Sequence, residues 1–444
     1  MKLKAGPINR SVLVLALPSI LANITVPLVG MADVAISGRL GDAASIGAVA
    51  VASMLFDLLY WNMGFLRIGT GSVAAQAYGR GDWPAVVRVF VQGMAVAVSF
   101  AALFILLQYP FLEVAFSFVN CSPEVEQLAR AYFYIRIWAA PATLSLNVFK
   151  GWFIGMQNTI PAMFIDVTVN LVNVGASAYL ALFTPLGFVG IAWGTLIAQY
   201  CGVIVGVSAI LLRYAHHFKG MSRKISDYTH GLKHFFMMNG NLFIRSLCLL
   251  AVYTTFTTLA ADYGDVQLAV STIMMKLMLL YSYFVDGFAY AGEALSGRYV
   301  GAGQRNMLKS TVKTIFVWCL AIGAVSTVAY GLWGDWMFGV LTDVPEVIAA
   351  SGEYMFWLLI MPIMSCIAFT WDGVYIGVGA SVAIRRCMLL SVAGYFAGIF
   401  ISRIWLDGVQ TLWVGFAMHL VVRTLYMSLV ARKEIFTKPF NKVL

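Results

Sequence analysis

Charged side chains are scarce in this sequence. Only 11% of its 444 residues are Asp, Glu, Lys or Arg, whereas 61% are hydrophobic and the mean hydropathy is +0.84. A soluble globule of this length needs far more polar surface to cover its core. The composition therefore excludes a soluble protein and predicts an all-α integral membrane protein that crosses the bilayer many times.

Histidine and cysteine are also few, and their positions argue against several kinds of site. Four of the five histidines, His216, His217, His230 and His234, lie in one polar stretch, and none is paired with a plausible nucleophile. An integral-membrane enzyme is therefore disfavoured, and no recurring ligand spacing predicts a metal site. The six cysteines show no CxxC spacing, and only Cys121 falls in a predicted external loop, so no disulfide is predicted. Nothing in the sequence calls for a cofactor.

Apolar runs of about 20 residues, the length that crosses a bilayer as a helix, recur with short gaps. The first run is too long for a cleaved signal peptide, and we expect it to be retained. Twelve transmembrane helices are predicted, at residues 11–37, 44–70, 85–108, 128–153, 159–183, 187–212, 235–260, 267–296, 311–333, 347–378, 384–405 and 408–431.

The second half of the chain repeats the first at a shift of about 222 positions. Three stretches agree on this spacing, which favours duplication over chance similarity among glycine-rich helices. Six crossings return each half to its starting side, so the two six-helix bundles are expected to be related by a pseudo-twofold axis along the membrane normal. The matching stretches are 64–65 (GF) with 286–288 (DGF), 150–155 (KGWFIG) with 372–377 (DGVYIG), and 193–194 (WG) with 413–415 (WVG).

Basic residues gather in alternate gaps between the predicted helices, and the other gaps are acidic or neutral. This positive-inside pattern predicts that both termini are cytoplasmic, despite exceptions at Arg39 and Arg403. It also accounts for the net charge of +9 without a nucleic-acid partner. The longest cytoplasmic connection, 213–234, is expected to link an N-terminal bundle at 1–212 to a C-terminal bundle at 235–444.

Proline interrupts the first predicted helix at Pro18 and Pro27. Because proline removes a backbone hydrogen bond and clashes with the preceding turn, a kink or an unwound turn is expected there. Either a hinge or a static kink would fit this pattern.

Several ionisable residues lie inside the predicted helices, where a charge at the bilayer centre costs about 2.5–3.5 kcal/mol. Asp33 is the sharpest candidate, because small residues surround it from Gly30 to Gly38. A carboxylate in an apolar cavity takes up a proton more readily than in water, which suits a transport cycle. For Asp57 and Asp166 a structural role is preferred.

Three acidic residues of the second half have no acidic equivalent in the first half. Asp286 and Glu293 are seven residues apart and share a helix face, and their repeat mates are Gly64 and Gly71. Asp372 has the unlike mate Lys150. These acids are predicted to line a cleft or form a second ion site. Salt bridges with Lys276, Arg245 or Arg67 are the structural alternative.

The fifth and sixth predicted helices carry uncharged polar residues. Asn170, Asn173 and Ser177 share one helix face, and Thr195 lies on the next helix. Together with Asp33 they would form a proton or cation site. Ordinary hydrogen bonding between helices is the alternative for each residue taken singly.

At these residues the chain resembles the multidrug and toxic compound extrusion (MATE) carriers, in their DinF-like branch. The resemblance covers nearly the whole chain. It is carried by the first-helix run from Leu17-Pro18 to Asp33, by Ala75-Gln-Ala-Tyr-Gly79, by Asp286-Gly-Phe-Ala-Tyr-Ala291 with Glu293, and by Asp372-Gly-Val-Tyr-Ile-Gly377.

The resemblance implies a secondary antiporter that exports amphipathic, often cationic compounds in exchange for protons or sodium ions. Asp33 resembles the family's coupling carboxylate, Pro18 its bending proline, and Asn170 and Thr195 polar partners of the acid. Ser177 stands where many relatives have a second aspartate, which favours protons over sodium. A flippase for lipid-linked sugars is the rival from the same superfamily. Because one chain holds both repeats, a monomer in the inner membrane is expected to suffice.

Overall fold

Helices make up every regular element in the part of the chain that the structure describes. This computed structural model covers residues 8–39, 43–119, 121–219, 228, 231–342 and 344–437. The chain divides into two compact units. We call Leu21–Phe235 the first-half unit, and Met1–Ile20 with Phe236–Leu444 the second-half unit.

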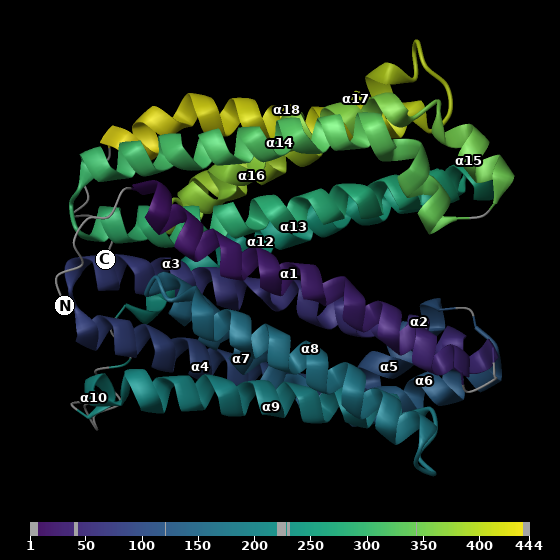
Figure 1. Cartoon of the computed structure of the whole chain (residues 1–444), viewed down its shortest axis with the longest axis horizontal. Helices are drawn as coiled ribbons and strands as arrows, with labels where there is room; N and C mark the ends of the chain where they lie inside the picture. The colour runs from purple at the N-terminus through teal and green to yellow at the C-terminus, as the bar shows by residue number, and fades with distance from the viewer. Residues whose placement is uncertain are drawn as a thin grey trace. The chain divides into compact units, whose positions relative to one another are not determined.

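The first-half unit contains the later part of α1 and the helices that follow it (Figure 1). Two short 3₁₀ turns, Trp61–Gly64 and Ile137–Ala139, connect consecutive helices there. Its elements are α1 (Ile8–Arg39), α2 (Ala43–Tyr60), α3 (Phe65–Arg80), α4 (Trp83–Leu106), α5 (Gln108–Phe118), α6 (Pro123–Arg136), α7 (Ala140–Gly155), α8 (Thr159–Leu182), α9 (Val189–Arg213) and α10 (Ala215–Phe218).

The second-half unit contains the start of α1 and the helices of the C-terminal half. A π-helical turn, Arg432–Thr437, extends its last helix. Its other elements are α12 (Leu232–Ala261), α13 (Asp265–Gly301), α14 (Arg305–Leu341), α15 (Pro345–Ser351), α16 (Met355–Gly377), α17 (Ser381–Ser402) and α18 (Gln410–Ala431).

Eleven helical stretches among the described residues are long and apolar enough to cross a membrane. The segment predicted at 128–153 is not among the eleven, and the turn at Ile137–Ala139 divides it into α6 and α7. These three elements still form one uninterrupted helical path from Pro123 to Gly155. The predicted class, an all-helical membrane protein with twelve crossings in two units, is confirmed.

The duplication is visible in how equivalent helices cross. In the first-half unit α7 packs on α3, and in the second-half unit α16 packs on α13. Both crossings depend on glycines, because an added Cβ would overlap a backbone carbonyl oxygen of the partner helix. The four glycine–carbonyl pairs are Gly151 with Arg67, Gly155 with Gly71, Gly373 with Ala289, and Gly377 with Glu293, and the second two follow the first two by 222 positions.

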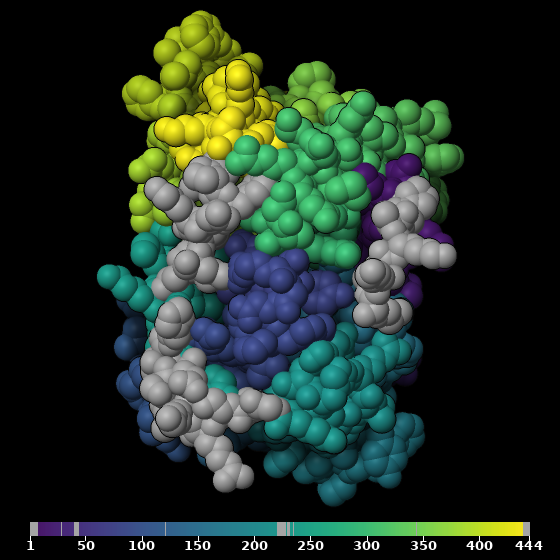
Figure 2. All heavy atoms as spheres, turned by 90° about the vertical axis from the view of Figure 1, so that its left-hand side faces the viewer, coloured from purple at the N-terminus to yellow at the C-terminus, as the bar shows by residue number. Residues whose placement is uncertain are grey.

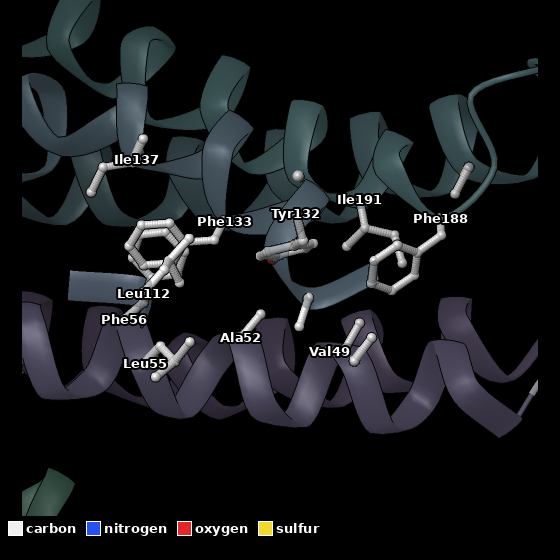
Figure 3. Packing of buried hydrophobic residues seen from close by; sticks show 14 of the residues in the cluster. Val49, Ala52, Leu55, Phe56, Leu112, Tyr132, Phe133, Ile137, Phe188 and Ile191 are labelled. Atoms are coloured by element: carbon white, nitrogen blue, oxygen red, sulfur yellow. The ribbon is translucent and has the colours of Figure 1, made fainter. Parts of the chain in front are cut away.

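An apolar cluster holds α2, α6 and α9 together in the first-half unit (Figure 3). The rings of Phe56 on α2 and Phe133 on α6 stack with their centroids 4.7 Å apart. Tyr132 and Ile191 are fully buried in the same cluster, and Ile36 adds the later part of α1. This packing fixes the helix faces that carry the polar residues discussed below.

The short helix α10 lies against the end of the first-half unit where α3 turns into α4 (Figure 2). The imidazole of His217 stacks on the indole of Trp83 with the ring centroids 3.5 Å apart. Burial and the neighbouring His216 lower the pKa of His217, so its ring is uncharged at neutral pH. The neutral ring therefore packs as an aromatic group and ties the start of the predicted linker to the bundle.

Helix α1 is shared between the two units. It is helical from Ile8 to Arg39, so the unwound turn that was one of two expectations at Pro18 is not formed. Residues up to Ile20 group with the C-terminal half, because Ala16 and Ile20 pack on Gly287 of α13. The division between the units thus falls two residues after Pro18 rather than only in the linker.

Candidate functional site

Asp33 lies on α1 within the first-half unit and is only 6% exposed. Its Oδ1 atom is buried and accepts no hydrogen bond from any residue that the structure describes. A buried carboxylate oxygen with no donor is costly while the group is ionised, and protonation removes most of that cost. Asp33 therefore has the surroundings of a proton-binding acid.

Polar residues of α8 connect this helix to its neighbours. Asn170 donates to the hydroxyl of Thr25 on α1 at 2.5 Å. One turn further along, Asn173 donates to the hydroxyl of Thr195 on α9 at 2.8 Å. These bonds link three helices of the unit through uncharged groups.

Ser177 serves mainly the packing of α8 on α9. Its hydroxyl donates to the carbonyl oxygen of Ile191 at 3.3 Å, and the residue is fully buried. A Cβ added to Gly194 would overlap the backbone and hydroxyl of Ser177, so the two helices touch here. The position offers a neutral oxygen where an aspartate would add a charge.

Two residues of α6 join the predicted set. The buried hydroxyl of Tyr132 interacts with Thr195 and, electrostatically, with Asp33. Arg136 donates to the same hydroxyl at 3.3 Å and also interacts electrostatically with Asp33. The sequence analysis did not predict Tyr132 as a site residue, because the sequence around an aromatic residue in an apolar run does not indicate which side chains will lie next to it.

The second-half acids lie on two helices of their own unit. Asp286 and Glu293 occupy α13, as their spacing predicted, with Asp286 partly buried and Glu293 1% exposed. Asp372 lies on α16 and is 5% exposed.

Asp372 forms a buried ionic cluster with two arginines. Its Oδ2 accepts from Arg245 of α12 at 2.8 Å and from Arg423 of α18 at 2.5 Å. The side chain of Arg423 is only 2% exposed, and that of Arg245 is 15% exposed. The cluster connects three helices, and Arg245 is one of the partners that the structural alternative named.

A partly exposed ion pair joins two helices of the first-half unit. Lys150 of α7 and Asp166 of α8 lie 2.9 Å apart and are each about a quarter exposed. This contact agrees with the structural role preferred for Asp166. Asp33, by contrast, forms no ion pair with any described residue.

Comparison with known proteins places this arrangement in a family. The MatE family model matches residues 18–179 and 242–402, one stretch in each half of the chain. The chain belongs to the MatE family. The matched stretches include Asp33 and all three second-half acids, and the resemblance inferred from the motifs is confirmed.

Individual relatives agree with this assignment. DNA damage-inducible protein F of Escherichia coli (strain K12) is 30% identical over 95% of this chain and 91% of its own length. Multidrug and toxin extrusion protein 1 of Homo sapiens is 25% identical over 91% of this chain and 71% of its own length. The first of these confirms the DinF-like branch.

A solved structure shares the fold throughout. It is described as the outward-facing conformation of a multidrug resistance MATE family transporter of the MOP superfamily. The two structures align with a TM-score of 0.86 over 97% of this chain and 96% of that one, at 16% sequence identity. The architecture is thus the one MATE transporters use.

Proposed function

We propose that this protein is a secondary active antiporter that exports amphipathic, often cationic small molecules in exchange for protons. The burial of Asp33, with one oxygen that has no donor among the described residues, carries the proposal. The names of the MATE relatives, which refer to multidrug and toxin extrusion, support the substrate class. No step of the proposed cycle needs an enzyme activity or a cofactor.

Neutral partners around Asp33 favour a proton over a sodium ion. Sodium binds best among several oxygens that include fixed negative charge, because its dehydration is costly. The hydrogen-bonded side chains Asn170, Asn173 and Thr195 supply oxygens but no charge, and Ser177 is engaged with a backbone carbonyl. A proton neutralises a single carboxylate without needing such a shell.

The second-half unit gives sodium less support than the sequence suggested. Asp372 is already neutralised by Arg245 and Arg423, so its charge is not free to attract a cation. Asp286 and Glu293 remain as candidates for lining the cleft or for a second ion site.

Alternating access would require the two units to change their arrangement during the cycle. Helix α1 belongs to both units, and Pro18 lies two residues before the division at Ile20. Proline weakens the helix by removing one hydrogen bond, which makes Pro18 the proposed hinge. The outward-facing description of the solved relative fits a carrier that adopts more than one state.

The driving ion is tested with purified protein in proteoliposomes. We expect an imposed pH gradient to drive dye transport in sodium-free buffer, with collapse of transport on adding a proton ionophore. Cationic, neutral and anionic dyes should be compared in parallel. A strict requirement for sodium, with no response to the pH gradient, would contradict the proposal and place coupling in the second-half unit.

The orientation in the inner membrane is tested by labelling. We expect both termini and the 213–234 connection to be cytoplasmic, because lysine and arginine gather there. In a variant without native cysteines, Ser222→Cys and Phe440→Cys place thiols in segments outside the described residues. A membrane-impermeant maleimide should label them only after the cells are opened. Labelling in intact cells would contradict the predicted orientation and place these segments outside.

A further inference from the structure

The end of α6 places a guanidinium group against the aromatic cluster of the first-half unit. The Cζ atom of Arg136 lies 4.6 Å from the ring centroid of Phe56 and 5.6 Å from that of Tyr132. Phe56 is itself stacked on Phe133, and these rings lie together in Figure 3. Because a cation is attracted to a ring face and both rings are packed, the position of Arg136 is well defined.

Two acids of the same unit share this one cation. Arg136 interacts electrostatically with Asp33 of α1 and with Asp57 of α2. Asp33 is buried, whereas Asp57 is exposed on the unit. Neither carboxylate forms an ion pair with Arg136 among the residues that the structure describes. Arg136 therefore interacts electrostatically with both acids without forming an ion pair with either.

Among the described residues, the other groups that interact with Arg136 carry no charge at neutral pH. They are the phenols of Tyr60 on α2 and Tyr132 on α6, with Thr195 of α9 next to the latter. With all three ionisable groups charged, Asp33, Asp57 and Arg136 sum to one negative charge. One bound proton makes the cluster neutral, which is the state that apolar surroundings favour.

We propose that Arg136 is a shared internal counter-ion for Asp33 and Asp57, which sets proton binding in the first-half unit at one proton per transport cycle. A proton from the outside solution bonds to the Asp33 carboxylate, and Arg136 then pairs with Asp57. When that proton leaves to the cytoplasm, Arg136 again stabilises both acids. The guanidinium stays protonated throughout.

This proposal rests on the proposed proton antiport and gives Asp57 a role beyond structure. It also adds a reason for disfavouring sodium. A guanidinium held near Asp33 repels any second cation, and a proton suffers least because it bonds directly to the carboxylate oxygen.

Charge-balance variants test the counter-ion role through pH-driven dye transport and the number of protons moved per dye. Asp57→Asn leaves Asp33 and Arg136 balanced without a proton, so we expect transport to fall about tenfold, the effect of one pH unit in proton binding. Arg136→Gln leaves two unbalanced acids. For it we expect the half-maximal pH to shift upward by about one unit and the proton count to rise from one to two.

The double variant Asp57→Asn/Arg136→Gln is the decisive one. It retains Asp33 as a single acid, so its net charge equals that of the native cluster. We expect it to transport within about threefold of the native protein, at one proton per dye, although each single change is harmful. A purely structural role for Arg136 would make the double variant at least as damaged as the Arg136→Gln protein.

Arg130→Gln is the matched control on the same helix. Arg130 pairs at the surface with Glu113 and Glu126, so its loss should leave transport unchanged. Arg136→Lys keeps the charge and should keep one proton per dye. Folding of every variant is checked by size-exclusion chromatography.

Several results would overturn the proposal. Unchanged transport by the Asp57→Asn variant would by itself overturn the proposal, because Asp57 is exposed and this variant should fold. A double variant no better than the worse single change has the same meaning. In both cases native transport that still requires Asp33 would leave proton antiport intact. Absence of pH-driven transport in the native protein would instead refute both proposals together.

Discussion

Replacing Asp33 by asparagine is expected to abolish coupled export and leave folded protein in the membrane. The change keeps the size of the side chain and removes the group that binds the proton. A driving ion acts only through its differential affinity for the states of a carrier. A site that cannot bind the proton therefore cannot couple the proton gradient to export. Dye transport against a gradient in proteoliposomes measures the effect, which should reach the level of empty vesicles.

The exposed acid Asp335 on α14 provides the control for this change. Asp335→Asn removes the same charge and should transport at the native rate. Facilitated dye flux down its own gradient should be tested in both variants, because loss of coupling need not block the path. Concentrative transport at the native rate by Asp33→Asn would show that another group couples the ion.

Replacing Asp372 by asparagine is expected to cause the largest loss of stability. The carboxylate is 5% exposed and is the partner of both Arg245 and Arg423. Its loss leaves one buried and one partly buried guanidinium group without this counter-charge, and breaking a buried pair costs about 3–5 kcal/mol. The apparent Tm of the protein in detergent should fall accordingly. It is measured by size-exclusion chromatography of heated samples.

The partly exposed pair Lys150–Asp166, with each side chain about a quarter exposed, offers a matched comparison. Because solvent screens it, Asp166→Asn should cost no more than about 1 kcal/mol. Replacing Arg245, Asp372 and Arg423 together by apolar residues of similar size should restore most of the stability lost in Asp372→Asn. Equal effects of Asp372→Asn and Asp166→Asn would show that the cluster is not an energetic centre of the second-half unit.

Much of the fold was predictable because the bilayer imposes simple rules. The hydrocarbon layer needs about 20 apolar residues per crossing, so twelve helices could be counted from the sequence. Duplication predicted the paired crossings, and Gly151 and Gly373 occupy equivalent contacts as the repeat requires. The segment at 128–153 differs in detail, since the turn at Ile137–Ala139 has no signature in an apolar run.

The candidate residues could be found in the sequence because a charge within an apolar run is energetically costly in the membrane and therefore requires an explanation. Their partners depend on the packing of helices far apart in the sequence. The sequence left three possible partners for Asp372, and in the structure it pairs with one of them, Arg245, which lies 127 positions away. Arg423, at 51 positions, was missed because it lies among apolar residues of the last helix.

What the sequence by itself determined is the membrane class, the duplicated helical architecture, the family resemblance and Asp33 as the sharpest acid. Only the tertiary structure decided that α1 divides between two units near Pro18, that Tyr132 and Arg136 accompany Asp33, and that Asp372 is neutralised by two arginines. The reason is physical. Apolar length and periodicity are local properties of the chain, whereas the energy of a buried charge depends on which distant side chains pack around it.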